Sequence, residues 1–364
     1  MAKSDDEIGK KEGGRMQMKA IICPRYGPPE VLAIRDVEKP IPQDNEVLVG
    51  IRATTVVPAD IRIRGFRVPP SFWVPARLAL GLTRPKKPVL GTEFAGVIEA
   101  IGKDVRGFKA GMHVFGLTGH ELGCYAEYRC VPEDGLIARK PINLSFEEAA
   151  AIPMGGLTAW SFLMKGRVSS GQRVLVYGAS GSIGTYAVQL AKHLGAEVTG
   201  VCSTANQNMV RSLGADRVID YTKEDFSKDG RVYDIIFDTV GKSSLRKDMR
   251  SLRAGGCLLQ AVAPPATNLR MRWAAITTGN KLVGGTMAAT PGDLVFLKEL
   301  AEARRIRPVI DRSYAMERIV DAHRYVDQGH KKGNVVITVG HDQAPPAEKT
   351  FLPSLRTSSP TRRG

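Results

Sequence analysis

Three glycines at the junction of an apolar run and an amphipathic run are the strongest chemical signal in the sequence. Gly178, Gly181 and Gly184 lie between a predicted strand over residues 173–178 and a predicted helix over residues 182–195. The pyrophosphate of a dinucleotide must approach backbone N–H groups at a helix N-terminus, and glycines permit that approach. The spacing is G-x-x-G-x-x-G rather than G-x-G-x-x-G, so the surrounding strand, turn and helix carry the prediction of a dinucleotide site. The alternative is a flavodoxin-like or purely structural glycine turn.

The end of the next predicted strand bears on which nicotinamide cofactor is used. NAD enzymes place an Asp or Glu there, about 20 residues after the first glycine, on the ribose 2′-hydroxyl. This chain has Ser203 and Thr204 and no acid, and Arg211 stands a helix turn or more away. Hydroxyls can donate to a 2′-phosphate that a carboxylate would repel, so the sequence favours NADPH over NADH. Ser203 and Thr204 could instead cap the next helix, and the two roles are compatible.

The elements that must position these groups follow two different sequence patterns along the chain. From Met18 to about Lys140, short β-like runs alternate with Gly, Pro and Asp turns and lack long helical periodicity, which predicts an all-β unit. From Ser145, runs rich in Val, Ile and Leu alternate with helical patterns, as in a doubly wound parallel sheet. The strands expected there cover residues 173–178, 197–202, 217–220, 234–240, 255–262 and 281–288, and the helices cover residues 145–166, 182–195, 208–213 and 243–252.

The 364 residues suggest two compact domains. We expect helices over residues 293–306 and 317–329 and a strand over residues 334–339, which return the chain to the first unit. The predicted divisions are disordered tails at 1–15 and 341–364, a β domain at 16–140 completed by 289–340, and a cofactor domain at 141–288.

The composition excludes several classes of protein. With 43% hydrophobic residues the chain can bury a large core, which excludes wholesale disorder. Five scattered cysteines do not form a disulfide scaffold and suit a reducing compartment. The first fifteen residues resemble neither a secretory signal nor an acid-poor transit peptide, and no run of ~18 apolar residues exists. We therefore expect the protein to be cytoplasmic.

The chain is strongly basic, with 52 Lys+Arg, 37 Asp+Glu and a formal charge of +15. Residues 61–88 contribute seven of these positive charges and contain no acid. Such a charge could serve nucleic acid, a membrane surface, an anionic ligand or solubility alone. Because the positive charge is concentrated in residues 61–88, the role of that segment says more about function than the net charge of the whole chain does.

Several blocks, taken in order, make the chain resemble a medium-chain dehydrogenase/reductase of the zinc-free, zeta-crystallin-like quinone oxidoreductase branch. The matching blocks include EVLVGIRATTVVPADIRIRG, PVLGTEFAGVIEAIGKDVRGFKAGMHVFG, AAAIPMGGLTAW, VLVYGASGSIGTYAVQLAKHLGAEVTGVCS and LGADRVIDYTKEDF, and the resemblance extends from about Met18 to Val339. It implies an α/β fold in which a GroES-like β domain is interrupted by a Rossmann domain.

The resemblance also implies a set of cofactor-binding positions. Thr158 would lie near the nicotinamide, and Asn334 near the nicotinamide end of the cofactor. The other positions implied are Gly178, Ser180, Gly181, Ser182, Ile183 and Gly184 on the pyrophosphate, Ser203 and Tyr221 near the adenosine phosphate beside Thr204, and Asp238, Thr239 and Val240 beside the cofactor. The chain departs from relatives at Ala205-Asn206, where a basic residue is common, and at Gly333-Asn334, where many have Gly-Lys.

No zinc site is expected. Zinc alcohol dehydrogenases of the superfamily use a Cys in the β domain and a His in a Gly-His-Glu segment, and leave one position open for the substrate oxygen. This chain has Val57-Pro58-Ala59-Asp60 at the first place and Gly91-Thr92-Glu93 at the second. The four-cysteine structural loop is absent too, and the spacing of His113, His120, Cys124 and Cys130 fits no usual site.

Without a Lewis acid, hydride transfer to an electron-poor acceptor is more natural than oxidation of a simple alcohol. The sequence therefore favours NADPH-dependent reduction of a quinone or an α,β-unsaturated carbonyl. Asp60 and Thr55 are the catalytic candidates, because they correspond to a segment that lines the cleft in relatives, and Glu93 is expected to be a buried structural carboxylate paired with a basic residue. The alternatives are an NAD(P)-dependent alcohol or aldehyde dehydrogenase and a non-catalytic NADPH- or RNA-binding protein.

The basic segment follows directly on the cleft residues. Its aromatic and leucine residues alternate with arginines, so it could form a lid or wall for a lipophilic acceptor, an oligomer contact, a weak contact with an anionic membrane, or a solvated loop. No specific nucleic-acid module is recognisable. The apolar edge of the strand predicted at 281–288 is paired across a two-fold axis in relatives, so a homodimer is expected.

Overall fold

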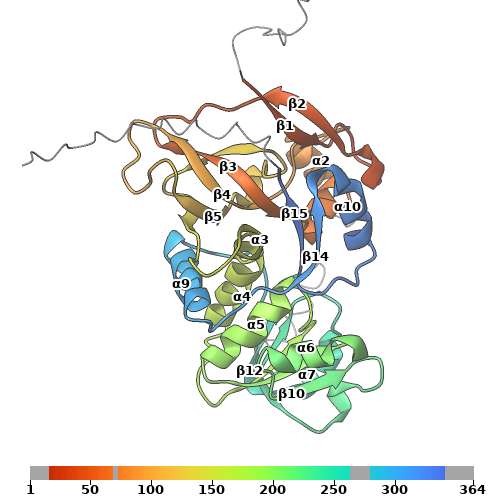
Figure 1. The fold of residues 1–364 in the computed structure, drawn as a ribbon. Helices are drawn as coiled ribbons and strands as arrows, with labels where there is room; N and C mark the ends of the chain where they lie inside the picture. Colours follow the sequence, from red (N-terminus) through yellow and green to blue (C-terminus); the bar gives the residue numbers. More distant parts are fainter. Residues whose placement is uncertain (1–15, 69–72, 263–278, 341–364) are drawn as a thin grey trace, which may run out of the picture.

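The computed structural model describes residues 16–68, 73–262 and 279–340, which fold into two parts (Figure 1). The predicted tails at 1–15 and 341–364 lie outside the described residues. None of the helices in the described segments is long and apolar enough to cross a membrane. The upper part in Figure 1 is built on β-sheets, and the lower part on a sheet flanked by helices.

The N-terminal part contains a two-stranded sheet and a larger, mixed sheet. β1 (Gln17–Ile22) pairs antiparallel with β2 (Ala33–Glu38). The larger sheet has the order β14-β15-β3-β4-β5-β7, and β6 pairs with β3. These strands are β3 (Glu46–Thr55), β4 (Glu93–Ile101), β5 (His113–Leu117), β6 (Tyr128–Pro132), β7 (Leu136–Arg139), β14 (Ile310–Ala315) and β15 (Asn334–Thr338). The last two come from near the end of the chain and join the larger sheet beside β3.

The second part is a parallel sheet with the order β10-β9-β8-β11-β12-β13. Its strands are β8 (Arg173–Tyr177), β9 (Glu197–Cys202), β10 (Arg217–Asp220), β11 (Tyr233–Asp238), β12 (Leu252–Gln260) and β13 (Lys281–Val283). Its helices are α4 (Pro153–Lys165), α5 (Ser182–His193), α6 (Gln207–Ser212), α7 (Leu245–Ser251) and α9 (Pro291–Glu302). The strand order reverses between β8 and β11, and ligands of doubly wound sheets bind outside the carboxyl ends of the strands at such a point.

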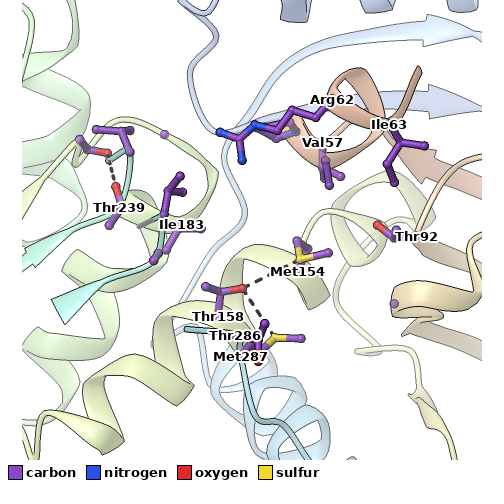
Figure 2. A pocket seen from close by; sticks show the side chains of 18 of the residues that line it. Val57, Arg62, Ile63, Thr92, Met154, Thr158, Ile183, Thr239, Thr286 and Met287 are labelled. Carbon is purple, nitrogen blue, oxygen red and sulfur yellow. Dashed lines mark hydrogen bonds between the residues drawn. The ribbon is translucent and has the colours of Figure 1, made fainter. Parts of the chain in front are cut away.

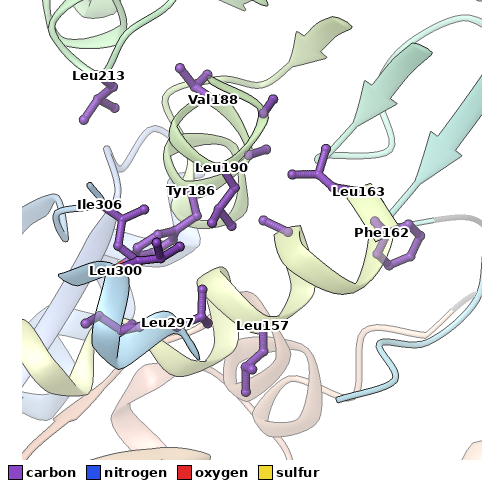
Figure 3. Close-up of a cluster of buried hydrophobic side chains, with 14 of the residues drawn as sticks. Leu157, Phe162, Leu163, Tyr186, Val188, Leu190, Leu213, Leu297, Leu300 and Ile306 are labelled. Carbon is purple, nitrogen blue, oxygen red and sulfur yellow. The ribbon is translucent and has the colours of Figure 1, made fainter. Parts of the chain in front are cut away.

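One hydrophobic core joins the two parts. Phe115 and Val336 of the first sheet belong to the same buried cluster as Phe162 of α4 and Leu297 of α9. Figure 3 shows α4, α5 and α9 contributing Leu157, Leu190 and Leu297 to this cluster. The cofactor part and the β part are therefore packed against each other through a continuous apolar layer.

Several boundaries differ from the sequence prediction for identifiable reasons. The helix expected over 145–166 is two helices, α3 (Phe146–Ala150) and α4, because Pro153 has no N–H to continue the first and instead begins the second. The strand expected over 281–288 ends at Val283, before a glycine pair in which Gly285 has φ +109°. The β-like run at residues 123–131 forms a regular strand, β6, only from Tyr128 onward.

The all-β interpretation of residues 18–140 is wrong at two places. α1 (Pro58–Arg64) and α2 (Trp73–Leu80) are short helices inside that region. α2 buries none of its side chains fully, so it lacks the apolar periodicity by which a helix is recognised. It is held instead by Arg77, whose guanidinium lies 3.8 Å from the ring centroid of Phe66 and 4.9 Å from that of Tyr26.

Candidate active site

A cavity of about 1050 Å³ lies between the two parts, and residues of both line it. In Figure 2, Ile183 and Thr239 of the cofactor part lie on one side, Ile63 and Thr92 of the β part lie on the other, and Thr158 lies between them. The cavity reaches the carboxyl ends of β8 and β9, where Tyr177 and Cys202 contribute to the lining. It is therefore continuous from the switch point of the parallel sheet to α1.

The glycine turn has the geometry that a dinucleotide needs. Gly178 has φ +81°, and a Cβ there would lie 2.8 Å from Thr239 Oγ1. A Cβ on Gly184 would lie 2.1 Å from the carbonyl oxygen of Gly178, so only glycine lets α5 pack this closely on the turn. Gly181 precedes α5 without a side-chain cap, and a Cβ there would lie 3.5 Å from the carbonyl oxygen of Gly178, an ordinary van der Waals distance. The free N–H groups and dipole of α5 are thus presented to the cavity.

The hydroxyls predicted at the end of β9 are used within the protein. Thr204 donates to the carboxylate of Asp220, and Asn206 donates to Ser203 Oγ at 3.1 Å. Hydrogen bonds from Thr204 and Thr222 lower the pKa of Asp220 to about 2. Neither Ser203 nor Thr204 lines the cavity, so the structure does not place them where the sequence argument needs them.

Other residues line the cavity at this end. Tyr221 follows β10, and Lys242 follows β11. Lys242 was not predicted, although its place after a parallel strand was a usable signal, because the carboxyl ends of such strands meet at one edge. Asp238 shapes this loop by accepting N–H groups of Val240 at 3.0 Å and Gly241 at 2.9 Å. Asp238 itself lies outside the cavity, whereas Thr239 and Val240 line it.

Thr158 and Lys331 both line the cavity. The Thr158 hydroxyl contacts only sulfur atoms, those of Met287 at 3.6 Å and Met154 at 3.9 Å, so it keeps hydrogen-bonding capacity (Figure 2). Lys331 Nζ donates to Ser182 Oγ at the start of α5 and to the carbonyl oxygen of Gly333. Burial lowers the pKa of Lys331 to about 8, against the opposing effect of Glu93.

Lys331 lines the cavity, whereas its near neighbour Asn334, the residue predicted from the sequence, does not. The predicted Asn334 is buried, donates to the carbonyl oxygen of Val309 at 3.3 Å and does not line the cavity. Sequence reasoning missed Lys331, although two adjacent lysines directly before the last strand are visible in the sequence. The loop between α10 (Ile319–Asp327) and β15 carries it to the glycine turn.

Asp60 belongs to a buried chain of hydrogen bonds. Its carboxylate accepts the Tyr125 hydroxyl at 3.1 Å, and Tyr125 contacts His323 Nε2 at 3.2 Å. His323 Nδ1 lies 3.2 Å from a guanidinium nitrogen of Arg64, which can only donate, so this histidine donates from Nε2. Burial and the Arg64 charge lower the pKa of His323 to about 3, so the ring is neutral.

Asp60 therefore positions the residues of the cavity wall but does not itself line the cavity. It also accepts the N–H groups of Val57 at 3.0 Å and Gly91 at 3.2 Å. Burial raises its pKa to about 6. The neighbouring residues Val57, Pro58 and Ala59 line the cavity, but Asp60 does not. This placement makes Asp60 a positioning residue for α1.

Thr55 and Glu93 form a second buried pair. The Thr55 hydroxyl donates to Glu93, which also accepts the N–H of Met154 at 2.6 Å. Burial raises the pKa of Glu93 to about 7. Its hydrogen-bond partners are therefore a hydroxyl and an amide. The basic residue that acts on Glu93 is Lys331, whose charge opposes the rise in the pKa. Neither residue lines the cavity.

Thr92 has the most suggestive environment in the β part. Its side chain is 3% exposed, it lines the cavity, and its hydroxyl has no hydrogen-bond partner among the described residues. A buried hydroxyl without a partner costs free energy unless a ligand supplies one. Sequence reasoning considered this position only as a missing metal ligand.

The comparisons with known proteins agree with this architecture. An alcohol dehydrogenase GroES-like domain matches residues 43–141, and a zinc-binding dehydrogenase domain matches residues 213–337. The chain is 34% identical over 338 residues to the 2-methylene-furan-3-one reductase of Solanum lycopersicum, covering 88% of this chain and 79% of the relative. It is 30% identical over 339 residues to the chloroplastic NADPH-dependent alkenal/one oxidoreductase of Arabidopsis thaliana, with the same coverage of 88% and 79%.

A solved structure extends the agreement to the fold. The quinone oxidoreductase from Coxiella burnetii superposes with a TM-score of 0.80 at 31% identity, covering 89% of this chain and all of that one. The chain belongs to the quinone oxidoreductase branch of the medium-chain dehydrogenase/reductase superfamily. The α/β prediction with GroES-like and Rossmann parts is confirmed, and the protein is an oxidoreductase that uses a nicotinamide cofactor.

A zinc ion does not fit the residues of this reductase. Val57 offers no ligand atom, and both carboxylate oxygens of Glu93 accept hydrogen bonds from Thr55 and Met154. Within residues 16–68, 73–262 and 279–340, no three His, Cys, Asp or Glu side chains gather closely enough to hold a metal ion. No step below is derived through a metal.

Proposed function

We propose that this oxidoreductase uses NADPH to reduce a quinone or an α,β-unsaturated carbonyl without zinc. The observation that carries the proposal is the buried, unpartnered hydroxyl of Thr92, a residue in the wall of a largely apolar cavity that reaches the dinucleotide turn. A hydrogen-bond donor held in a dry wall is suited to an oxygen that gains negative charge during reduction. The printed names of the relatives, a furanone reductase, an alkenal/one oxidoreductase and a quinone oxidoreductase, support the same class of acceptor.

The chain's own residues would hold the cofactor along one side of the cavity. The N–H groups at the start of α5 and the Lys331 ammonium group would receive the pyrophosphate, and the Thr158 hydroxyl would face the nicotinamide. When bound, the reduced nicotinamide supplies the hydride. Thr239 and Val240 restrict the cofactor from the β11 side.

The preference for NADPH is part of the proposal. Lys242 has no hydrogen bond or ion pair from its side chain to a described residue, and it lines the cavity with Tyr221 beside the ends of β9 and β10. A 2′-phosphate there would meet an unpaired cation. The nearby Asp220 does not line the cavity, and its oxygens accept hydrogen bonds from Thr204 and Thr222.

Reduction of an enone then needs two things from the protein. The apolar wall, which includes Ile63 and Leu122, limits water and aligns the acceptor's β-carbon. Thr92 would donate to the carbonyl oxygen, which gains the negative charge of an enolate when hydride adds to the β-carbon. A proton from solvent at the α-carbon then completes the saturated ketone. Among the described lining residues there is no aspartate or glutamate to accept the proton of an alcohol.

An oxidation screen tests the proposal. NADPH and NADH consumption would be followed with quinones, enones and aldehydes, and NADP⁺ reduction with alcohols, each with and without a chelator. We expect turnover with quinones or enones, a lower KM for NADPH than for NADH, and no effect of chelation. Activity confined to alcohols would favour the dehydrogenase alternative. No turnover combined with salt-sensitive RNA binding would favour the non-catalytic alternative.

We also propose the cytoplasm as the location of the enzyme. All five cysteines are free, and burial raises the pKa of the Cys124 thiol to about 12. Unreactive, unpaired thiols agree with a reducing compartment. Cell fractionation would test this, and recovery from an organelle or a membrane pellet would contradict it.

A further inference from the structure

The charges on the cavity wall are one-sided. Among the described residues, five lysine and arginine side chains line the cavity, and no aspartate or glutamate does. Lys242 and Lys331 lie toward the cofactor, near Tyr221 and Ser182 respectively. The other three, Arg62, Lys86 and Lys87, come from the β part, on the side that the proposed function gives to the acceptor.

Two of these three cations are engaged elsewhere. Lys87 forms an ion pair with Glu121 at 2.7 Å on the exposed rim. Lys86 Nζ donates to the carbonyl oxygen of Leu78 at 2.6 Å and so closes the end of α2. The Lys86 charge has no acidic partner among the described residues, but its position is fixed by this bond.

Of these three cations, Arg62 is the one whose side chain has no hydrogen-bond or ion-pair partner among the described residues. Its neighbours on the same segment are paired, because Arg64 and Arg67 both form ion pairs with Asp327. Ala59, Arg62 and Ile63 are spaced i, i+3 and i+4, so one face of α1 turns all three to the cavity. In Figure 2 the Arg62 side chain extends from α1 over the cavity toward the side of Ile183.

Arg62 projects from an apolar stretch of the wall. Ile63 is its neighbour on α1 and Val57 directly precedes that helix, and the further apolar residues of the β part that line the cavity are Leu80, Pro85, Leu117 and Leu122. A guanidinium above an apolar wall can bind a carboxylate through two parallel hydrogen bonds while the wall covers the rest of the molecule. The compartment therefore matches an amphipathic acid better than a neutral acceptor.

We propose that the preferred acceptor is an amphipathic anion whose carbonyl oxygen meets Thr92 and whose acidic group meets Arg62. This inference rests on the proposed reductase function and narrows its substrate class to enones or quinones that carry a carboxylate or a comparable anion. Thr92 determines where reduction occurs, and Arg62 determines which molecules are oriented for it. Lys86 adds a second positive charge at the same end.

A matched pair of acceptors tests the proposal. The carboxylate 4-(3-oxobut-1-enyl)benzoate and its carboxamide have the same enone and nearly the same shape. We expect kcat/KM to be at least 10-fold higher for the carboxylate at low salt, with the preference reduced at high salt. Arg62→Gln should lower kcat/KM for the carboxylate by about 10- to 100-fold and leave the carboxamide nearly unchanged. Arg62→Lys should lie between the two.

Arg52→Gln is the charge-matched control, because Arg52 is exposed on β3, lies outside the cavity lining and has no side-chain partner. It should leave both acceptors unaffected. Equal kcat/KM for carboxylate and carboxamide in the unchanged enzyme would overturn the proposal while leaving the reductase function intact. A rise in the KM for NADPH in Arg62→Gln, equal with both acceptors, would also overturn it, because Arg62 would then bind a cofactor phosphate.

If neither enone is reduced, a binding measurement still tests the anion site at Arg62 separately from the reductase function. The saturated ketone 4-(3-oxobutyl)benzoate and its carboxamide would be titrated calorimetrically into the enzyme saturated with NADP⁺. Tighter binding of the carboxylate that is lost in Arg62→Gln supports the anion site even without turnover. Equal binding of the two compounds contradicts it.

Discussion

At the scale of single residues, the buried polar groups near the cavity differ in whether their hydrogen bonds are satisfied within the protein. Asp60, Thr55 and Glu93 are satisfied by internal hydrogen bonds, whereas Thr92 is not. A group that acts on a ligand must keep a free lone pair or proton. The candidates for chemistry are therefore the unsatisfied side chains and not the most strongly perturbed carboxyl groups.

Removal of the Thr92 hydroxyl should impair the chemical step. Thr92→Val keeps the shape of the side chain but leaves the acceptor oxygen without its donor. We expect kcat with a quinone or enone to fall by about 100-fold, with little change in the KM for NADPH. Thr92→Ser retains the hydroxyl and should restore most of the activity. Unchanged kcat in Thr92→Val would show that the hydroxyl does not contact the reacting oxygen.

Lys331 gives the binding of NADPH a pH dependence. Its pKa of about 8 means that the ammonium group loses its proton as the pH rises through that value, so its attraction to phosphate is present below pH 8 and lost above it. The Kd for NADPH should rise across this range, and Lys331→Met should raise it about 10- to 100-fold at pH 7 and remove the dependence. Lys332→Met is the control, because its exposed side chain lies outside the cavity. Fluorescence titration of NADPH would measure both effects, and a pH dependence that survives in Lys331→Met would contradict the assignment.

At the scale of elements, α1 carries three cavity-lining side chains on one face, those of Ala59, Arg62 and Ile63, and is anchored to α10 by the other. Arg64 is fully buried and bonds Asp327 at 2.6 Å and His323 at 3.2 Å. Through His323 and Tyr125 the same chain reaches Asp60 at the start of α1. The position of Arg62 and Ile63 in the cavity therefore depends on contacts made from the opposite face of the helix.

Breaking this anchor should cost stability as well as activity. Arg64→Met leaves Asp327 and His323 without a buried donor, and we expect unfolding to become easier by about 3–5 kcal/mol. Arg67→Gln removes the exposed partner of the same Asp327 and should cost at most about 1 kcal/mol. Urea denaturation compares the two. Similar losses in both variants would mean that the buried pair does not anchor α1.

At the scale of the whole molecule, the positive charge of residues 61–88 is distributed among separate tasks. Arg64 is buried in the α1–α10 contact, and Arg77 lies over aromatic rings. Arg62, Lys86 and Lys87 reach the cavity. Ala79 and Leu80 line the cavity too, which favours the wall interpretation of this segment over a membrane contact or a nucleic-acid patch.

The oligomeric state is a prediction at the same scale. β13 is the last strand in the described order of the parallel sheet, so its outer edge is open to pairing with a second copy. We expect a homodimer, and light scattering across a dilution series should give twice the mass of one chain. A monomer at all concentrations would contradict the prediction.

The order of strands and helices was predictable because local pattern determines it. The glycine turn, the change of sequence pattern at Ser145 and the missing zinc ligands are properties of neighbouring residues. They were sufficient for the α/β class, the superfamily and the dinucleotide turn. The helices α1 and α2 were not predicted because a helix of one or two turns with few buried residues shows little periodicity of apolar residues.

Which side chains face the cavity was decided only by the tertiary structure. Thr55 is the last residue of β3, and Asp60 lies five residues further on, close to the lining residues Val57 and Ala59, yet both bond to internal partners. Lys242 and Lys331 reach the cavity from loops far away in the sequence. The direction of a side chain depends on the strand's pairing and on which buried donors need an acceptor. Those conditions involve residues far apart in sequence, so the sequence determined the cofactor turn, and folding determined the rest of the site.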